Sequence, residues 1–234
     1  MSKKILYTLG IFFPLFLHAV GMGISVPVTL YEKEKLSYST SDIPTTTYHY
    51  EPHSGIGFVF DSNVGQDKTF SYRFNIEYSI ADIESSSRLY SSNLRKHKFN
   101  LVNTFGFGVI QEQYVRFWVG QRINIQYEHT SSDSNIRVQN SYGIGLAAAA
   151  GLNVILAEKL SLAFDVDYHG TLLFGGESYR DYDGTTTGDV THYTGYIGTN
   201  RDFTVRLYLL FVFGEQFEQR TITPAEDSVI DYSL

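Results

Sequence analysis

Eight charged residues in this sequence have the types and the spacing needed to pair with one another. Each occupies a polar position in a stretch where polar and apolar residues alternate. Four are arginines and four are carboxylates: Arg73, Arg116, Arg122 and Arg206 against Glu77, Glu128, Asp165 and Asp167. Guanidinium and carboxylate groups satisfy each other's hydrogen bonds, whereas an unpaired charge in a narrow interior is costly. We therefore predict an internal charge network, with Asp167 and Arg206 as its best single pair.

Catalytic motifs are sparse by comparison. The segment Glu128-His129-Thr130-Ser131 has a His-x-Ser pair that resembles the lipid A deacylases of outer membranes, but no further Glu follows before Glu158. A second set resembles the acidic protease rim of the omptins and comprises Asp181, Asp183, Asp189, His169 and His192. There is no P-loop, dinucleotide fingerprint or HExxH motif. We expect a protein that is not an enzyme and has no cofactor or metal, with a lipid-modifying barrel enzyme as an alternative.

The elements that must position the eight charges are β-strands. Along residues 70–80, apolar or aromatic residues alternate strictly with polar ones. A helix would scatter both sets around its circumference, so this period of two indicates a strand. The alternation recurs at residues 55–64, 99–109, 114–128, 142–150, 160–168 and 203–213. A barrel with both ends on one side needs an even number of strands, so we assign an eighth to residues 24–31. Its alternation breaks down at Glu32-Lys33-Glu34-Lys35.

The connections between these strands alternate in length. Short gaps fall at residues 65–68, 110–113 and 156–159, and long polar connectors at 39–52, 82–96, 129–137 and 175–200. Short turns on one side and long loops on the other are typical of outer-membrane barrels. A soluble β-sandwich or lipocalin-like barrel would show the same period. Strand length, loop asymmetry and mid-strand charges favour an all-β, antiparallel up-and-down transmembrane β-barrel of about eight strands.

Composition supports this class and excludes others. Charged residues make up 18% of the 234 residues, and aromatic residues 15%. The mean hydropathy of −0.14 fits a barrel, in which lipid-facing and lumen-facing residues cancel. A net charge of −7 argues against a nucleic-acid partner. The absence of cysteine excludes a disulfide scaffold, a thiolate metal site and a lipoprotein anchor.

The N-terminus has the features of an export signal. Lys3 and Lys4 precede an apolar run from Ile5 to Leu17, and small residues follow. We predict a signal peptide over residues 1–21 with cleavage after Gly21 or Gly23, a barrel over 24–213 and a polar tail over 214–234. The expected location is the outer membrane of a diderm (Gram-negative) bacterium. The expected partners are the bilayer, lipopolysaccharide or an equivalent outer-leaflet lipid, and the barrel-assembly machinery.

With signal, strands, lumen charges and long loops together, residues 24–213 resemble the small outer-membrane barrels: OmpX, the OmpA transmembrane domain, the opacity proteins and OmpW. The chain departs from them because a polar tail follows Phe213 where such barrels end on an aromatic residue.

Two functions follow from this architecture. An eight-stranded barrel is only just wide enough for its own side chains, so charge pairing predicts a plugged lumen. We then expect the surface loops to carry the function, either in adhesion or in contact with a host or another surface ligand. The tyrosine-rich segment 177–200 is the candidate recognition loop, with Tyr179, Tyr182, Tyr193 and Tyr196. The alternative that the OmpW resemblance implies is a narrow channel for small or hydrophobic molecules.

Overall fold

The structure, a computed structural model, describes residues 20–40, 45–62, 69–84, 93–112, 114–132, 137–181 and 190–213. Most of the expected signal peptide, the polar tail 214–234 and Tyr182 lie outside the described residues. No helix among the described residues is long and apolar enough to cross a membrane.

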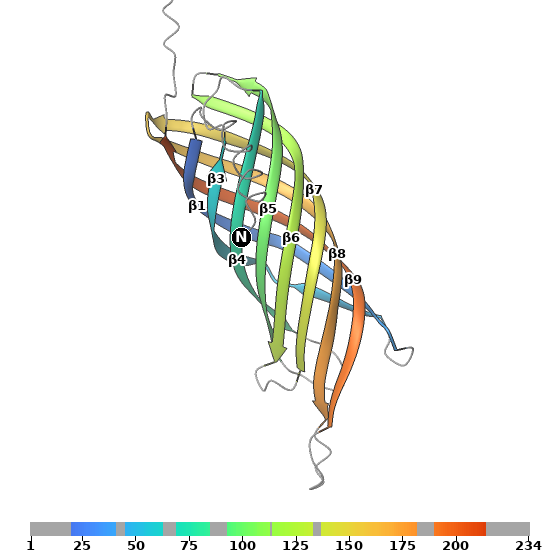
Figure 1. The fold of residues 1–234 in the computed structure, drawn as a ribbon. Helices are drawn as coiled ribbons and strands as arrows, with labels where there is room; N and C mark the ends of the chain where they lie inside the picture. Colours follow the sequence, from blue (N-terminus) through green and yellow to red (C-terminus); the bar gives the residue numbers. More distant parts are fainter. Residues whose placement is uncertain are drawn as a thin grey trace, which may run out of the picture.

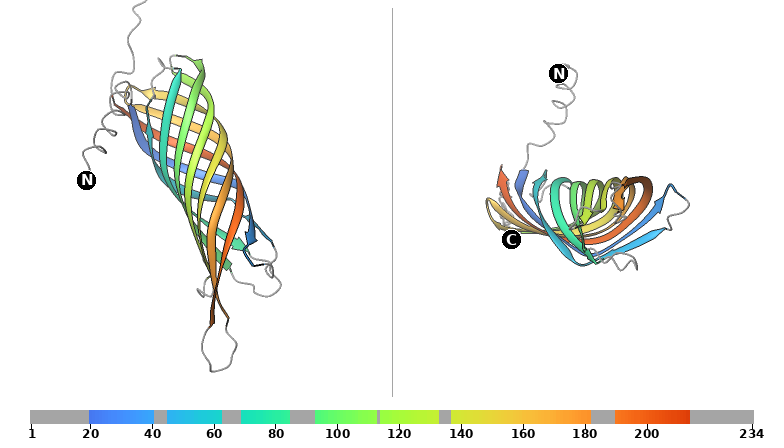
Figure 2. Two further views of the ribbon diagram at one scale, coloured as in Figure 1. Left: turned by 45° about the vertical axis from the view of Figure 1, so that its right-hand side comes forward. Right: turned by 90° about the horizontal axis from the view of Figure 1, so that it is seen from below.

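The described chain forms a closed ring of antiparallel strands (Figures 1 and 2). The strands are β1 (Val20–Tyr38), β2 (Thr46–Tyr50), β3 (His53–Asp61), β4 (Phe70–Glu84), β5 (Asn93–Gln111), β6 (Val115–Ser132), β7 (Arg137–Ala157), β8 (Leu160–Asp181) and β9 (Val190–Phe213). From β3 onward each strand pairs with the next along the chain, and β1 pairs with β9 to close the ring.

Two of the strands share one position in the ring. β2 and β3 both pair with β1, and the register continues unchanged from Leu36↔Thr46 to Gly21↔Asp61. Pro52, which has no backbone N–H to donate, lies between them and interrupts the ladder. The ring therefore has eight strand positions, and the predicted eight-stranded antiparallel barrel is confirmed.

The polarity of the ring is inverted relative to a soluble protein. On β4 the alternating residues Arg73, Asn75 and Glu77 point inward and are buried, whereas Phe70 and Ile76 are exposed on the outer face. Large exposed apolar residues also lie on β1 and on every strand from β3 to β9. A soluble β-sandwich would bury this face, so the exposed belt identifies the surface that contacts lipid.

The first strand is longer than its pattern predicts. The register between β1 and β9 shifts between Thr29 and Tyr31, which marks a β-bulge. As a result, Leu30 and Tyr31 both face outward, and Glu32 and Glu34 face the lumen. The predicted break at residues 32–35 is therefore wrong. The predicted external loop at residues 39–52 is also wrong in part, since it contains β2.

The strands extend well beyond the thickness of a membrane. β4 reaches Glu84, β5 begins at Asn93, β8 reaches Asp181 and β9 begins at Val190, so the predicted connectors 82–96 and 175–200 are too long. The 24 residues of β9 rise about 60 Å along a barrel axis at the usual tilt, against an apolar band of roughly 25 Å. The excess forms a rim on the side of the longer connections. The β5–β6 and β7–β8 connections at the opposite end are short, as predicted. β1 begins at Val20, so both expected cleavage positions fall within it.

Candidate functional site

Buried arginines and carboxylates join opposite walls of the barrel interior. Arg73 on β4 places Nη2 2.6 Å from Oδ2 of Asp61 on β3 and Nη1 3.1 Å from Oδ2 of Asp165 on β8. Asp165 Oδ2 also accepts a hydrogen bond of 2.5 Å from Arg122 Nη2 on β6. A charge pair of this kind offsets the cost of removing each group from water. Residues far apart in the sequence therefore share one ionic cluster.

A second carboxylate extends the cluster to β9. Asp167 Oδ2 contacts Nη1 of both Arg122 and Arg206. Arg206 in turn places Nε 2.7 Å from Glu77 Oε1 on β4. The predicted Asp167–Arg206 pair is thus present in the structure. Because Arg206 bridges β4, β8 and β9, it ties the closing strand to the opposite wall.

A separate group, the Lys96 cage, comprises Lys96, Glu32, Glu34 and Glu128. Lys96 Nζ lies 2.7 Å from Glu32 Oε1, 3.0 Å from Glu34 Oε2 and 2.7 Å from Glu128 Oε1. All four side chains are almost fully buried, and the ammonium lies 4.3 Å from the centre of the Tyr50 ring. The alternation pattern predicts Lys96 in an external connector and Glu128 in the arginine network. The structure corrects both, because β5 begins at Asn93 and Lys96 falls on its inward parity.

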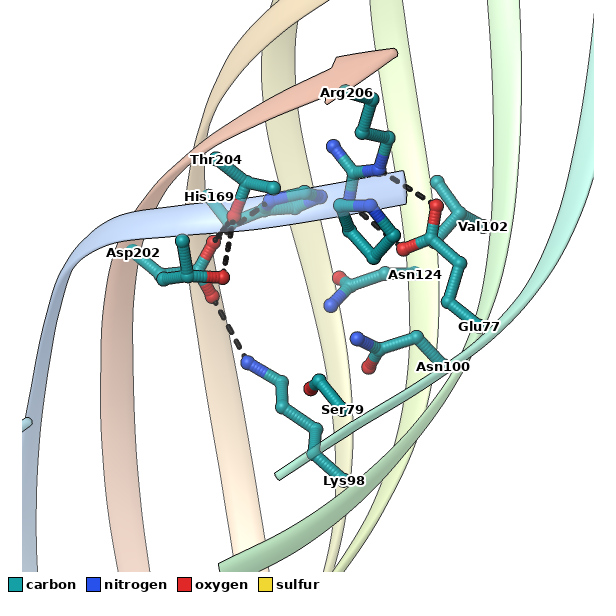
Figure 3. Close-up of a pocket in the computed structure, with 12 residues that line it drawn as sticks. Glu77, Ser79, Lys98, Asn100, Val102, Asn124, His169, Asp202, Thr204 and Arg206 are labelled. Atoms are coloured by element: carbon teal, nitrogen blue, oxygen red, sulfur yellow. Dashed lines mark hydrogen bonds and ion pairs between the residues drawn. The ribbon is translucent and has the colours of Figure 1, made fainter. Parts of the chain in front are cut away.

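A small polar cavity lies along the lumen, lined in part by Lys98, Asn124, His169, Asp202 and Arg206 (Figure 3). Lys98 Nζ is 3.2 Å from Asp202 Oδ2, and His169 Nδ1 is 3.1 Å from Asp202 Oδ1. The cavity volume is about 10 Å³, close to the smallest that holds one water molecule. His169 is buried here rather than at the rim. Asp183 and Asp189, which belong to the omptin-like set, lie outside the described residues.

Apolar clusters lie in the lumen toward both of its ends, alongside the ion pairs. Toward the short turns, the cluster comprises Val59, Ala163, Tyr208, Leu210 and Val212. Toward the rim, it comprises Leu36, Tyr48, Tyr50, Ala81, Ile83, Leu94, Leu173 and Tyr196. Close-packed side chains leave few voids larger than a water molecule, so these clusters reduce the open space of the lumen toward both ends.

Small residues on one wall make room for this packing. The inward face of β7 carries Gly143, Gly145, Ala147, Ala149 and Gly151. A Cβ atom on Gly151 would come within 2.6 Å of the Trp118 ring. Trp118 is buried, and its ring centre lies 5.4 Å from Arg73 Cζ and 6.0 Å from Arg122 Cζ. The small residues of β7 therefore leave space for Trp118, which stacks against two arginines of the network.

The four tyrosines proposed as a recognition surface do not share one environment. Tyr193 is 81% exposed on β9, as expected of a surface residue. Tyr196 is instead 5% exposed and packs edge-to-face with Tyr38, with 5.8 Å between ring centres. Its assignment to the surface is wrong because β9 continues through it on the inward parity. Tyr179 pairs with Arg137 in the β7–β8 ladder.

Arg116 lies apart from the mid-lumen carboxylates. It is buried near the short turns, where its Nη2 donates to the backbone carbonyl of Thr69 at 3.2 Å. At the opposite end, Arg137 Nε lies 2.5 Å from Glu177 Oε1, and Gln139 donates to the same carboxylate. Ion pairing therefore continues up to the rim.

Sequence reasoning missed several members of the ionic network: Glu32, Glu34, Asp61, Lys96, Lys98, His169 and Asp202. The parity of the recognised strands, continued outward, would have found all but two of them. Glu32 and Glu34 needed the bulge, whose signal is two consecutive large apolar residues, Leu30 and Tyr31, on the outer face.

Two groups in the described chain bring possible metal ligands within 4.8 Å of one another: Asp167, His169 and Asp202, and also Glu32, Glu34 and Glu128. In the second group the Lys96 ammonium already occupies the space between the carboxylates. In the first group Arg122 and Arg206 contact Asp167, and Lys98 contacts Asp202. These neighbouring cations make both groups ion-pair networks.

Comparison with known proteins supports the architecture. No protein-family model and no curated protein matches the chain. Its structure is similar to the outer membrane protein OprG from Pseudomonas aeruginosa, with a TM-score of 0.61, 9% identity, and coverage of 85% of this chain and 97% of OprG. Weaker likenesses reach Ail of Yersinia pestis (TM-score 0.37, 11% identity, 82% and 99% coverage) and Neisserial surface protein A (TM-score 0.35, 14% identity, 80% and 98% coverage).

The inverted polarity, the closed ring and this fold likeness define the class. The chain has the fold of the small β-barrels of the bacterial outer membrane.

Proposed function

We propose that this barrel is closed to solute flow and acts through its outer rim, in adhesion or another surface interaction. The observation that carries the proposal is the filled lumen. Two apolar clusters, one toward the short turns and one toward the rim, and a network of buried ion pairs between and beside them occupy the lumen. A solute would have to break buried ion pairs, whose disruption costs about 3–5 kcal/mol each.

The length of the strands supports the second half of the proposal. The β8–β9 ladder continues to Asp181↔Val190, well beyond the apolar belt. A barrel with no function beyond a closed lumen would not need strands that extend so far past the apolar belt. Extended rims present side chains on a rigid frame, and Tyr193 is an exposed aromatic residue of the kind enriched in recognition surfaces.

The alternative is a narrow channel, and the polar cavity beside Lys98 and His169 is the observation that favours it. Conductance across planar bilayers separates the two functions. Insertion of each preparation is verified by a heat-dependent shift in gel mobility. We expect no stable unitary current from the inserted barrel. A reproducible open state would contradict the closed lumen and support the channel.

Adhesion is tested by shortening one connection. Asp181 and Val190 remain paired at the end of the ladder, so residues 183–188 can be replaced by Gly-Ser without moving the strand ends apart. Bacteria that display the variant are counted on a cultured epithelial monolayer. We expect at least a fivefold loss of attachment. The matched control replaces residues 133–136, between β6 and β7, by Asn-Gly. Equal attachment by the parent and both variants would contradict a role for the 183–188 connection.

A further inference from the structure

We infer that the outer wall of β1, β2 and β9 carries a binding site for the phosphate groups of the phosphorylated glycolipid of the outer leaflet. The site, called here the β1–β9 basic patch, comprises Lys33, Lys35 and Arg201, with His49 at its edge. All four side chains lie on the outward parity, because the residues between them face the lumen. The inference is independent of whether the lumen conducts.

Strand register places these basic side chains side by side. Lys33 on β1 is the register partner of Arg201 on β9 and, on its other side, of His49 on β2. Lys35 follows on the same face of β1. Neighbouring strands lie about 4.8 Å apart. Two or three cations therefore stand within reach of one phosphate group.

The patch lies at the edge of the apolar belt. Tyr31 and Phe203 are register partners on the outer wall, and the next outward pair toward the rim is Lys33 and Arg201. From Met22 to Tyr31, β1 rises roughly 20–25 Å along the barrel axis, about the height of the apolar band. On β1 the cations thus follow the apolar residues directly on the rim side, and this position assigns them to the depth of lipid headgroups, while exposed Ile197 on β9 lies farther toward the rim.

Within the part of the chain that the structure describes, no carboxylate forms an ion pair with the patch. The carboxylates of β1 and β9 among the described residues are Glu32, Glu34 and Asp202, and all three face the lumen. Glu51 is exposed between β2 and β3, but no described ion pair joins it to the patch. By contrast, exposed Arg95 on β5 is paired with Asp82 at 3.0 Å.

The wall beside Arg201 is also open. Its register partner on β8 is Gly170, and a Cβ atom placed there would meet nothing within 4 Å. A bulky headgroup can therefore approach the guanidinium from this side, while its acyl chains lie against the belt. A bidentate guanidinium beside an ammonium is a strong phosphate-binding arrangement.

Binding of purified lipopolysaccharide to the refolded full barrel in zwitterionic detergent tests the inference. The test variant is Lys33→Gln/Arg201→Gln. The matched control, Arg95→Gln/Lys159→Gln, removes two exposed cations elsewhere. With about a fivefold effect per cation, we expect the test variant to bind roughly 30-fold more weakly and the control to change less than threefold. A heat-dependent gel shift verifies that each variant is folded. The charge-conserving variant Lys33→Arg/Arg201→Lys should retain binding.

Three further arms identify the ligand. Dephosphorylated lipopolysaccharide should bind the parent protein as weakly as the intact lipid binds the test variant. Millimolar inorganic phosphate should not displace the lipid, and phosphatidylglycerol micelles should bind less tightly than lipopolysaccharide. Displacement by free phosphate would reassign the patch to a small anion, and equal binding of phosphatidylglycerol would reassign it to any anionic surface. If the test and control variants lose lipopolysaccharide binding to the same extent, the patch is not the binding site.

Discussion

Replacing Lys96 with methionine removes the ammonium group from between three buried carboxylates. Methionine keeps a similar length and volume, so the change isolates the charge. Glu32 retains Lys98 at 3.6 Å and Asn200 at 2.7 Å, but Glu34 and Glu128 are left without this cation. The carboxylate oxygens stand within 4.8 Å of one another.

The contacts of Lys96 set the expected size of the effect. At an effective dielectric constant of about 20, the three attractions amount to roughly 18 kcal/mol and the three carboxylate repulsions to roughly 10 kcal/mol. The free-energy cost of removing the four charged groups from water cancels most of this net attraction. Removing one partner of a buried ion pair costs about 3–5 kcal/mol, and we expect Lys96→Met to fall in or above this range.

The neighbouring residue supplies the matched control. Arg95 pairs with Asp82 on the outer wall, with side chains 56% and 67% exposed. An exposed pair contributes about 0.2–1 kcal/mol, so Arg95→Met should change stability little. The measurement is guanidinium-induced unfolding of barrels refolded in lipid vesicles. Trp118 is the sole tryptophan and is buried in the lumen, so its fluorescence reports the packing directly.

A calcium titration sharpens the test. Without the ammonium, three clustered carboxylates provide the oxygen ligands that Ca²⁺ prefers. Millimolar Ca²⁺ should therefore restore part of the stability of Lys96→Met and leave the parent and Arg95→Met unchanged. If Lys96→Met and Arg95→Met unfold within about 1 kcal/mol of each other, the cage does not stabilise the barrel and the reasoning fails.

Two further predictions use the same unfolding assay. Gly151→Ala should cost about 1–3 kcal/mol and shift Trp118 emission, because the added Cβ would overlap the indole ring and the Asp165 side chain. Gly170→Ala is its control and should be nearly neutral, since nothing lies within 4 Å; equal effects would refute the packing argument. Tyr196→Ala should cost about 3–5 kcal/mol as a buried aromatic truncation, whereas Tyr193→Ala, at 81% exposure, should cost less than about 0.5 kcal/mol. If Tyr196→Ala is as stable as the parent protein, Tyr196 does not stabilise the lumen and its interpretation as a surface residue stands.

Alternation along the chain was sufficient to predict most strands. The residues of β4 alternate so strictly that inward and outward faces can be read from Arg73, Glu77, Phe70 and Ile76. The Asp167–Arg206 pair was also predictable, because the two residues have the same parity at similar depths on consecutive strands. Such inferences are local, since a strand period is a property of neighbouring residues.

The sequence by itself thus determined the class of protein, the eight strand positions and the presence of paired lumen charges. The tertiary structure decided which charges meet. A single bulge at Leu30 and Tyr31 turned Glu32 and Glu34 inward, and closure of β1 on β9 carried them toward Lys96. It also decided where strands end, moving Tyr196 from an expected loop into the lumen. Bulges, strand ends and cross-barrel pairs depend on register around the whole ring, and no stretch of sequence contains that register alone.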